Sequence, residues 1–256
     1  MKMFNIKILK AFEDNYMYVV YDSIKKLAIA VDPADSNIMS SFINENKLNL
    51  KAILTTHHHS DHAGGNEQMN LKYPEAKIYG GDTRIPKMTD IIGKHCQEIE
   101  CIGLKFICLK TPCHTKGHIC YYTDNLPTPI VFTGDTLFSM GCGRFFEGDA
   151  EQMETSLNKI IAKLDPKTKV YFGHEYTAKN LNFVCSIEQN NGELKKYKEI
   201  VDNTLSKGEY SSPSNLKDEL SYNPFMRTSE SNLQNILRTD NPISTMKVLR
   251  KMKNEF

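Results

Sequence analysis

The chain has 256 residues, of which 40% are hydrophobic and 25% are charged, and its formal net charge is +1. These values are ordinary for a globular protein and leave room for one large domain, or for one domain with an appendage. The near-neutral charge, and a sequence without any run approaching the ~20 apolar residues of a membrane span, argue against a nucleic-acid or membrane partner.

The N-terminal two-thirds of the chain alternates short apolar runs with turns. Residues 1–20 lack the continuous apolar run of a secretory signal, because charged and amide side chains interrupt them. Further along, β-branched and aromatic runs predict strands, and helical apolar spacing predicts two helices. The predicted strands are 15–22, 26–33, 51–56, 76–81, 104–112, 118–124, 129–135 and 169–175, and the predicted helices are 35–46 and 150–164.

The pattern changes after Tyr176, where the strand signals end. Helical segments separated by Gly, Ser and Pro follow and predict a small helical domain. The predicted helices of this region are 194–208, 214–226, 231–238 and 241–256.

The seven cysteines are scattered along the chain and form no C-x-x-C pair. This spacing disfavours a zinc ribbon or a redox motif. In a chain without a secretory signal, free thiols in a reducing compartment are expected. The sequence therefore predicts a cytoplasmic protein.

Residues 55–65, TTHHHSDHAGG, concentrate ligand-type side chains on the loop after strand 51–56. Metal ligation requires imidazoles or carboxylates that converge from a rigid frame. In an extended segment residues i and i+2 point the same way, so His57 and His59 can share one ion. Asp61 and His62 can then face a second ion as the chain turns. The alternative is a polar surface loop that happens to be rich in histidine.

Three more ligand-type residues follow apolar strands: His114 in TPCHTKGH, Asp135 in FTGDTLF and His174 in YFGHEY. Strand ends gather side chains into a cleft. The seven residues suit two metal ions, with three ligands for each ion and one shared carboxylate. We therefore predict a binuclear metal site.

The motifs HHHSDH, TPCHT, GDTLF and GHEY, in this order and spacing, resemble those of the metallo-β-lactamase superfamily. With EDNYMYVVYD near the start, GCGRFFEG at 141–148 and the helical C-terminal region, the chain resembles the glyoxalase II (hydroxyacylglutathione hydrolase) family over essentially its whole length. The resemblance implies an α/β fold, an αββα metallo-β-lactamase sandwich followed by a small all-α C-terminal domain. We expect a catalytic domain at 1–176 and a helical substrate-binding domain at 177–256.

The resemblance also implies the ligand assignments. His57, His59 and His114 would hold the first metal, Asp61, His62 and His174 the second, and Asp135 would bridge them. The expected cofactors are two divalent ions; zinc is favoured, and iron and manganese stay open because a mixed nitrogen and oxygen ligand set suits all three.

The expected reaction follows from the two ions. Bound metal lowers the pKa of water to about 7, so a hydroxide held between the ions would attack a thioester carbonyl that a metal polarises. Asp61 and Asp135 would be the catalytic carboxylates. The family's usual substrate is S-D-lactoylglutathione, which would give D-lactate and glutathione.

Glutathione contacts are expected on two segments. In the family, basic residues of the last helix bind the glycine carboxylate, and Arg250 and Lys253 match them, although a solvated basic helix face is the alternative. Arg144 and Phe146 stand where the family often has Lys and Tyr, so one family hydrogen bond is in doubt. Tyr176 matches a glutathione-contacting tyrosine. The oligomeric state is left open, with a monomer favoured.

The same motifs leave three alternative functions. The main alternative is a mononuclear iron oxidoreductase like the glutathione-persulfide dioxygenases. A metallo-nuclease is disfavoured by the near-neutral charge, and a non-catalytic metal-binding protein by the complete ligand set.

Overall fold

The computed structural model describes residues 4–189 and 191–256. The chain forms two compact units: one comprises the chain up to Lys110 together with Gly117–Gly134, and the other comprises Thr111–Lys116 and Asp135–Phe256. The boundary that we predict at 176 lies inside the second unit and stays a prediction. Across the described ranges, no helix is both long and apolar enough to cross a membrane.

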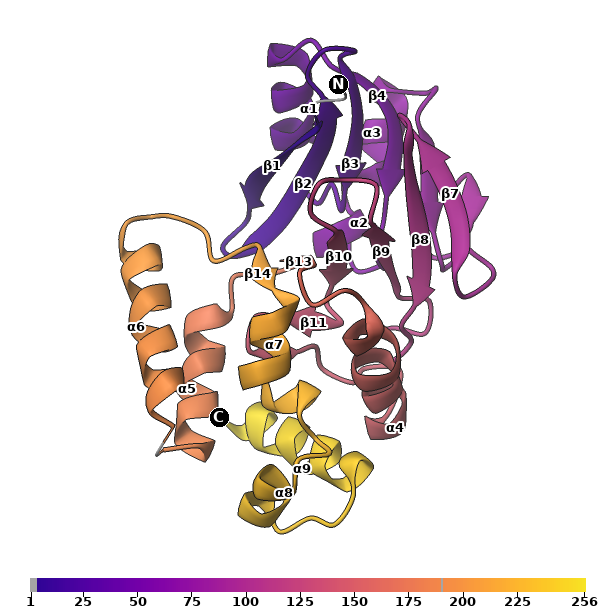
Figure 1. The fold of residues 1–256 in the computed structure, drawn as a ribbon. Coiled ribbons are helices and arrows are strands. Elements are labelled where there is room, and N and C mark those ends of the chain that lie inside the picture. The colour runs from indigo at the N-terminus through magenta and orange to yellow at the C-terminus, as the bar shows by residue number, and fades with distance from the viewer. Residues whose placement is uncertain (1–3, 190) are drawn as a thin grey trace. The chain divides into compact units, whose positions relative to one another are not determined.

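The first unit begins with a six-stranded sheet whose order is β1-β2-β3-β4-β5-β6 (Figure 1). β2 is antiparallel to both of its neighbours, β1 and β3, whereas β3, β4, β5 and β6 pair in parallel. The strands are β1 (Phe4–Ala11), β2 (Asn15–Asp22), β3 (Leu27–Val31), β4 (Asn49–Leu54), β5 (Lys77–Gly80) and β6 (Asp90–Ile91).

Helices cover one face of this sheet. α1 (Ser36–Glu45) starts at Asp35, whose carboxylate accepts two backbone N–H groups of the first turn. With α3 (Asn66–Lys72), α1 buries Met39, Ile43 and other apolar side chains against the sheet in one core cluster. The one-turn helix α2 (Ser60–Ala63) carries the DH of the histidine motif.

The parallel register brings two loops to one edge of the sheet. Val31, the last residue of β3, pairs with Leu54, the last residue of β4. The residues that follow these strands therefore meet at the carboxyl edge, which is where ligand sites of parallel sheets form. This register explains why the loop after β3 lies beside the histidine loop after β4.

A second set of strands in the first unit is antiparallel, in the order β7-β8-β9-β10. Its strands are β7 (Gln97–Cys101), β8 (Leu104–Lys110), β9 (Ile119–Thr123) and β10 (Ile130–Gly134). The two sheets pack face to face: the Tyr121 hydroxyl donates to the carbonyls of Thr55 and Tyr79 at 2.9 and 3.2 Å, and the rings of Tyr18 and Phe132 lie 5.4 Å apart.

The second unit is mainly helical. Its apolar core includes the stacked rings of Phe183 and Phe225, and the buried Arg227 makes two 2.8 Å hydrogen bonds to Glu188. Its elements are β11 (Leu137–Phe138), β12 (Gly141–Cys142), α4 (Ala150–Glu154), the π-helix η1 (Thr155–Ile160), the 3₁₀ helix η2 (Ile161–Lys163), β13 (Lys169–Phe172), α5 (Thr177–Ile187), α6 (Gly192–Ser206), β14 (Ser214–Asn215), α7 (Leu216–Tyr222), the 3₁₀ helix η3 (Pro224–Met226), α8 (Ser231–Leu237) and α9 (Pro242–Glu255).

Most of the predicted elements are confirmed, and the differences have local causes. The predicted helix 214–226 is wrong at its C-terminal end, because α7 stops at Tyr222. Asn223 precedes Pro224, and the proline ring disfavours helical backbone at the preceding residue. The predicted elements also omit β1, β7, α3 and α5, although β1 alternates apolar and polar residues from Phe4 to Ile8 and α5 has helical apolar spacing at Leu181, Val184 and Ile187.

Candidate metal centre

The histidine loop of the first unit brings two imidazoles into close apposition. His57 Nε2 lies 3.1 Å from His59 Nδ1, and His57 is fully buried. A tetrahedral ion with metal–nitrogen distances of 2.0–2.1 Å separates two of its ligand nitrogens by about 3.3 Å. The observed spacing is therefore close to that of two imidazoles on one ion, and these residues fit a metal.

Hydrogen bonds of Asp32 fix the tautomers of two histidines. Its carboxylate accepts from His62 Nδ1 at 2.9 Å and from the Thr56 hydroxyl at 2.7 Å. Because the Thr56 hydroxyl gives its proton to Asp32, it accepts from His57 Nδ1 at 3.0 Å. Both rings are thus protonated on Nδ1, which leaves Nε2 with the lone pair that a metal needs.

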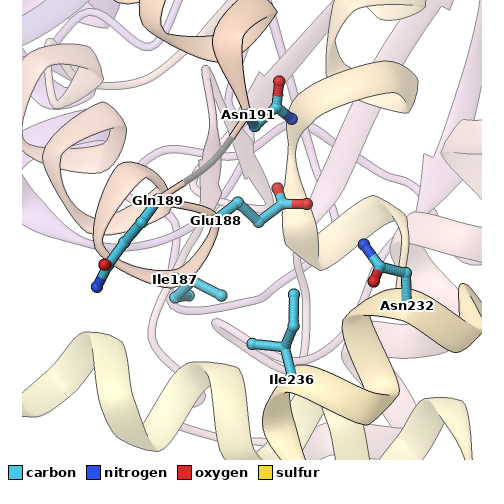
Figure 2. A pocket seen from close by; sticks show the side chains of 6 residues that line it. All are labelled: Ile187, Glu188, Gln189, Asn191, Asn232 and Ile236. Carbon is cyan, nitrogen blue, oxygen red and sulfur yellow. The ribbon is translucent and has the colours of Figure 1, made fainter.

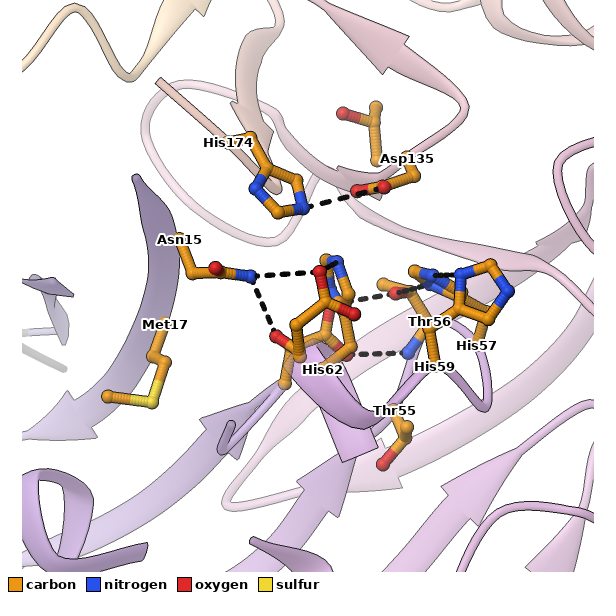
Figure 3. Close-up of polar contacts among 12 residues, drawn as sticks. Asn15, Met17, Thr55, Thr56, His57, His59, His62, Asp135 and His174 are labelled. Carbon is orange, nitrogen blue, oxygen red and sulfur yellow. Dashed lines mark hydrogen bonds and ion pairs between the residues drawn. The ribbon is translucent and has the colours of Figure 1, made fainter. Parts of the chain in front are cut away.

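Asn15 holds the carboxylate of the same loop. The buried Asn15 amide donates to the Asp61 carbonyl at 2.8 Å and approaches Asp61 Oδ2 at 3.4 Å (Figure 3). Asp61 Oδ2 in turn lies 4.0 Å from His62 Nε2. The Asp61–His62 pair that we predict for one metal is therefore brought together within this unit.

In the second unit, one carboxylate oxygen lies beside both predicted histidines. Asp135 Oδ2 is 3.4 Å from His114 Nε2 and 3.5 Å from His174 Nε2, and all three residues are buried (the His174 contact is drawn in Figure 3). The sequence analysis assigns these histidines to different ions. A carboxylate that touches one ligand of each set has the chemistry of a bridging ligand.

Backbone and aromatic contacts orient these rings. The Arg144 carbonyl accepts from His114 Nδ1 at 3.0 Å, so Nε2 keeps its lone pair on the side of Asp135. The Tyr176 ring stacks on His174 at 4.8 Å. Phe146, which is 61% exposed, packs edge-on against His114 at 5.2 Å. Phe146 and Tyr176 thus lie directly against predicted ligands.

The two predicted carboxylate-binding cations are on α9 and differ in environment. Arg250 is buried; it donates to the Cys142 carbonyl at 2.8 Å and lies over the Phe225 ring. Lys253 is half-buried, and burial, followed by the positive charge of Arg250, lowers its pKa to about 8. Neither cation has a carboxylate partner among the described residues. The pair would gain from a shared anion.

Two cavities open in the second unit. One of about 470 Å³ is lined by Arg250, Phe145 and residues of α4 and α9. The other, of about 530 Å³, contains none of the predicted site residues within the described ranges; Figure 2 shows its lining of Ile187, Glu188, Gln189, Asn191, Asn232 and Ile236.

Three residues that hydrogen-bond to predicted ligands were not identified from the sequence: Asn15, Asp32 and Thr56. Asp32 carried a usable signal, since it is an acidic residue at the end of an apolar strand, like Asp135. Asn15 and Thr56 carried none, because their partners are 46 and 24 residues away in the sequence.

Known families and relatives match this chain over most or all of its length. Residues 13–92 match the model of the metallo-beta-lactamase superfamily, and residues 175–256 match that of the hydroxyacylglutathione hydrolase C-terminus. The cytoplasmic hydroxyacylglutathione hydrolase of Arabidopsis thaliana is 40% identical, over 100% of this chain and 99% of the relative. The hydroxyacylglutathione hydrolase of Aliivibrio salmonicida is 39% identical, over 99% of this chain and 100% of the relative.

Solved structures share the fold at lower identity. ETHE1 from Myxococcus xanthus aligns with a TM-score of 0.70 and 22% identity, covering 96% of this chain and 90% of that one. The BLEG-1 B3 metallo-beta-lactamase aligns with a TM-score of 0.66 and 20% identity, over 87% and 99%. The predicted fold class, a metallo-β-lactamase α/β fold with a helical C-terminal domain, is confirmed.

The C-terminal match favours the hydrolase over the dioxygenase. It covers the helical region, residues 175–256, on which the predicted preference for a hydrolase rests. The similarity to hydroxyacylglutathione hydrolases extends over the full chain. The chain belongs to the hydroxyacylglutathione hydrolase family of the metallo-β-lactamase superfamily.

Proposed function

We propose that this protein is a binuclear-metal thioesterase that hydrolyses S-D-lactoylglutathione and related 2-hydroxyacylglutathiones to the 2-hydroxy acid and glutathione. The observation that carries the proposal is the single Asp135 oxygen that lies within 3.5 Å of the Nε2 atoms of both His114 and His174. The full-length similarity to hydroxyacylglutathione hydrolases supports the substrate class.

The proposed ligand sets are those of the sequence analysis. One ion takes His57, His59 and His114, the other takes Asp61, His62 and His174, and Asp135 serves both. The Nδ1 protonation of His57, His62 and His114 supports this, because each ring then offers Nε2 as a ligand atom. The two carboxylates of this ligand set, Asp61 and Asp135, would partly neutralise the positive charge of two divalent ions.

When bound, two divalent ions supply a nucleophile at neutral pH and polarise the substrate carbonyl. The net reaction forms a C–O bond from water and breaks the C–S bond. Glutathione leaves as a thiolate, and because an ordinary thiol has a pKa of about 8.5, its departure needs no strong acid. The protein's part is to hold the imidazole tautomers through Asp32, Thr56 and the Arg144 carbonyl.

We further propose that glutathione is bound by Arg144, Phe146, Tyr176, Arg250 and Lys253. Contact of Phe146 and Tyr176 with predicted ligand rings supports this, since a thioester bound over them has its carbonyl near the ligands. Arg250 and Lys253, for which the described part of the chain offers no carboxylate partner, suit the glycine carboxylate of the tripeptide. Phe146 cannot donate the hydrogen bond that a tyrosine makes.

The proposed setting is the cytoplasm, with the protein acting as a monomer. The Arabidopsis relative carries the word cytoplasmic in its name. The seven cysteines of this chain are free thiols in the structure, as a reducing compartment requires.

The test combines two measurements on one purified sample. Elemental analysis should give close to two divalent ions per chain, and the thioester absorbance of S-D-lactoylglutathione should be lost on addition of the protein. One tightly bound iron together with no thioester hydrolysis would instead favour the persulfide dioxygenase.

A further inference from the structure

Side chains from the helical part of the same unit form hydrogen bonds with the hairpin that links Asp135 to Arg144. β11 and β12 form this hairpin, residues 137–142. From α5, the Asn180 amide donates to the Ser139 carbonyl at 2.9 Å. Asn223, which follows α7, donates to the carbonyls of Gly141 and Phe138 at 3.1 and 3.3 Å.

A carboxylate also binds the hairpin, at its turn. Glu219 Oε2 accepts from the Met140 backbone N–H at 2.9 Å and from the Asn223 amide at 3.0 Å. Met140 has a φ of +57°, a left-handed conformation that costs a non-glycine residue free energy. Because Glu219 and Asn223 are fully buried, these bonds form without competition from water and hold the turn in this conformation.

The hairpin packs closely against α5. A Cβ atom on Gly141 would lie 2.6 Å from the Asn180 side-chain nitrogen. Glycine is therefore needed for the close approach that lets Asn180 reach the Ser139 carbonyl.

The hairpin leads directly to two predicted ligands. A Cβ on Gly143 would lie 1.9 Å from the Asp135 carbonyl oxygen and 2.9 Å from His114 Nδ1. One residue further, the Arg144 carbonyl accepts the Nδ1 hydrogen of His114 at 3.0 Å. The position of residues 143–144 thus sets the ring orientation of His114, and the hairpin sets the position of residues 143–144.

We propose that Asn180 and Asn223 are positioning residues of the metal centre: they hold the 137–142 hairpin so that the Arg144 carbonyl keeps His114 Nε2 aimed at Asp135. This inference rests on the proposed metal site. It gives the helical region a role in metal binding that is separate from any contact with substrate. Outer partners of metal-bound histidines typically change metal affinity about tenfold to a hundredfold when removed.

The test replaces each amide by an isosteric carboxylate that cannot donate. Asn180→Asp and Asn223→Asp remove the bonds to the hairpin carbonyls, and Asp at 223 keeps the side-chain oxygen that accepts the Phe225 N–H. The matched control is Asn158→Asp. Asn158 donates to Glu154, the Phe225 carbonyl and Thr228 in the same unit, without binding the hairpin.

Metal affinity is measured by competition with a chelator, alongside kcat, KM and the melting temperature of the metal-free protein. We expect Asn180→Asp and Asn223→Asp to weaken the binding of at least one ion by about tenfold to a hundredfold, and to lower kcat more than they raise KM. Asn158→Asp should lower the melting temperature but keep the parent metal affinity.

The outcomes separate the two proposals. A parent protein that binds no metal contradicts the proposed function. A parent that binds two ions, with hairpin variants that bind them as tightly as the Asn158 control, overturns the positioning role. If an aspartate variant does not fold, Gly141→Ala tests the same contact from the hairpin side, and unchanged metal affinity in that variant also overturns it.

Discussion

Asp32 is a residue that acts on the predicted metal ligands without being one of them. It holds His62 directly and His57 through the Thr56 hydroxyl. Its backbone is left-handed, with a φ of +47°, which costs free energy and persists only where the surroundings impose it. The hydrogen bonds that the buried Asp32 carboxylate accepts from an imidazole and a hydroxyl hold the backbone in this conformation.

We predict that Asp32→Asn weakens metal binding about tenfold to a hundredfold, the usual effect of losing an outer partner of a ligating histidine. Asp32 Oδ2 accepts from His62 Nδ1 and the Thr56 hydroxyl, and Oδ1 accepts from the Thr56 backbone N–H. An amide has one accepting oxygen, so its NH2 group would face at least one of these donors. Chelator competition measures the effect. Asp22→Asn is the control, since the buried Asp22 carboxylate caps the turn at Ile24 and Lys25; equal losses in both variants would remove the specific role of Asp32.

The proposed bridging role of Asp135 predicts a loss that involves both ions. If one side chain serves both ions, Asp135→Ala should reduce the binding of the two ions together and lower activity by orders of magnitude. Elemental analysis of the purified variant measures this. A variant that keeps two ions and most of its turnover would show that Asp135 does not bridge.

Helix α9 combines a structural face with a charged one. Met246 and Leu249 are fully buried in the unit, whereas Lys247 and Lys251 are exposed. Arg250 lies between these faces and donates one N–H group to the Cys142 carbonyl of the hairpin. Removing Arg250 should therefore disturb both substrate binding and the hairpin, so Lys253 is the cleaner probe of the glutathione contact.

We predict that KM for glutathione thioesters rises as pH increases through about 8, the pKa of Lys253. Below this pH the ammonium is charged and can pair with the glycine carboxylate; above it, the group is neutral and the pairing is lost. Lys253→Arg should remove this rise, because a guanidinium stays protonated. A parent KM that is flat between pH 7 and 9, which brackets the pKa, would show that Lys253 does not bind the carboxylate.

Elements with a local sequence pattern could be predicted, whereas contacts that depend on distant partners could not. Strands 118–124 and 169–175 were recognisable from their own residues, and so was the ligand motif. The Asn15–Asp61 contact depends on tertiary pairing across 46 residues. The hairpin at 137–142 was missed because its strands have two residues each, too few to show a period.

For the whole molecule, Glu219 links the fold of the helical unit to pH. The carboxyl is fully buried, and this burial raises its pKa from 4.5 to about 7, although the Met140 N–H and the Asn223 amide partly counter the shift. Nearby Tyr197 stays protonated, since burial also raises its pKa. The folded protein therefore binds a proton that the unfolded chain has released between pH 4.5 and 7.

The sign of the pH effect follows from this proton. Where the folded state binds more protons than the unfolded state, the free energy of unfolding falls as pH rises. The contribution of Glu219 is complete below its unfolded pKa and is lost as pH rises through about 7. At about 1.36 kcal/mol for each pH unit between the two pKa values, the loss is about 3 kcal/mol.

We predict that Glu219→Gln removes this loss, because the amide keeps an oxygen for the Met140 N–H and carries no charge. Denaturant unfolding of parent and variant at pH 5 and pH 8 measures it. Relative to the parent, the variant should gain about 2.5 kcal/mol between these two conditions, because pH 5 already lies above the unfolded pKa. Comparing the two proteins cancels titrations that they share, including those of the predicted metal ligands. A difference between parent and variant that is the same at both pH values would mean that Glu219 is ionised throughout this range.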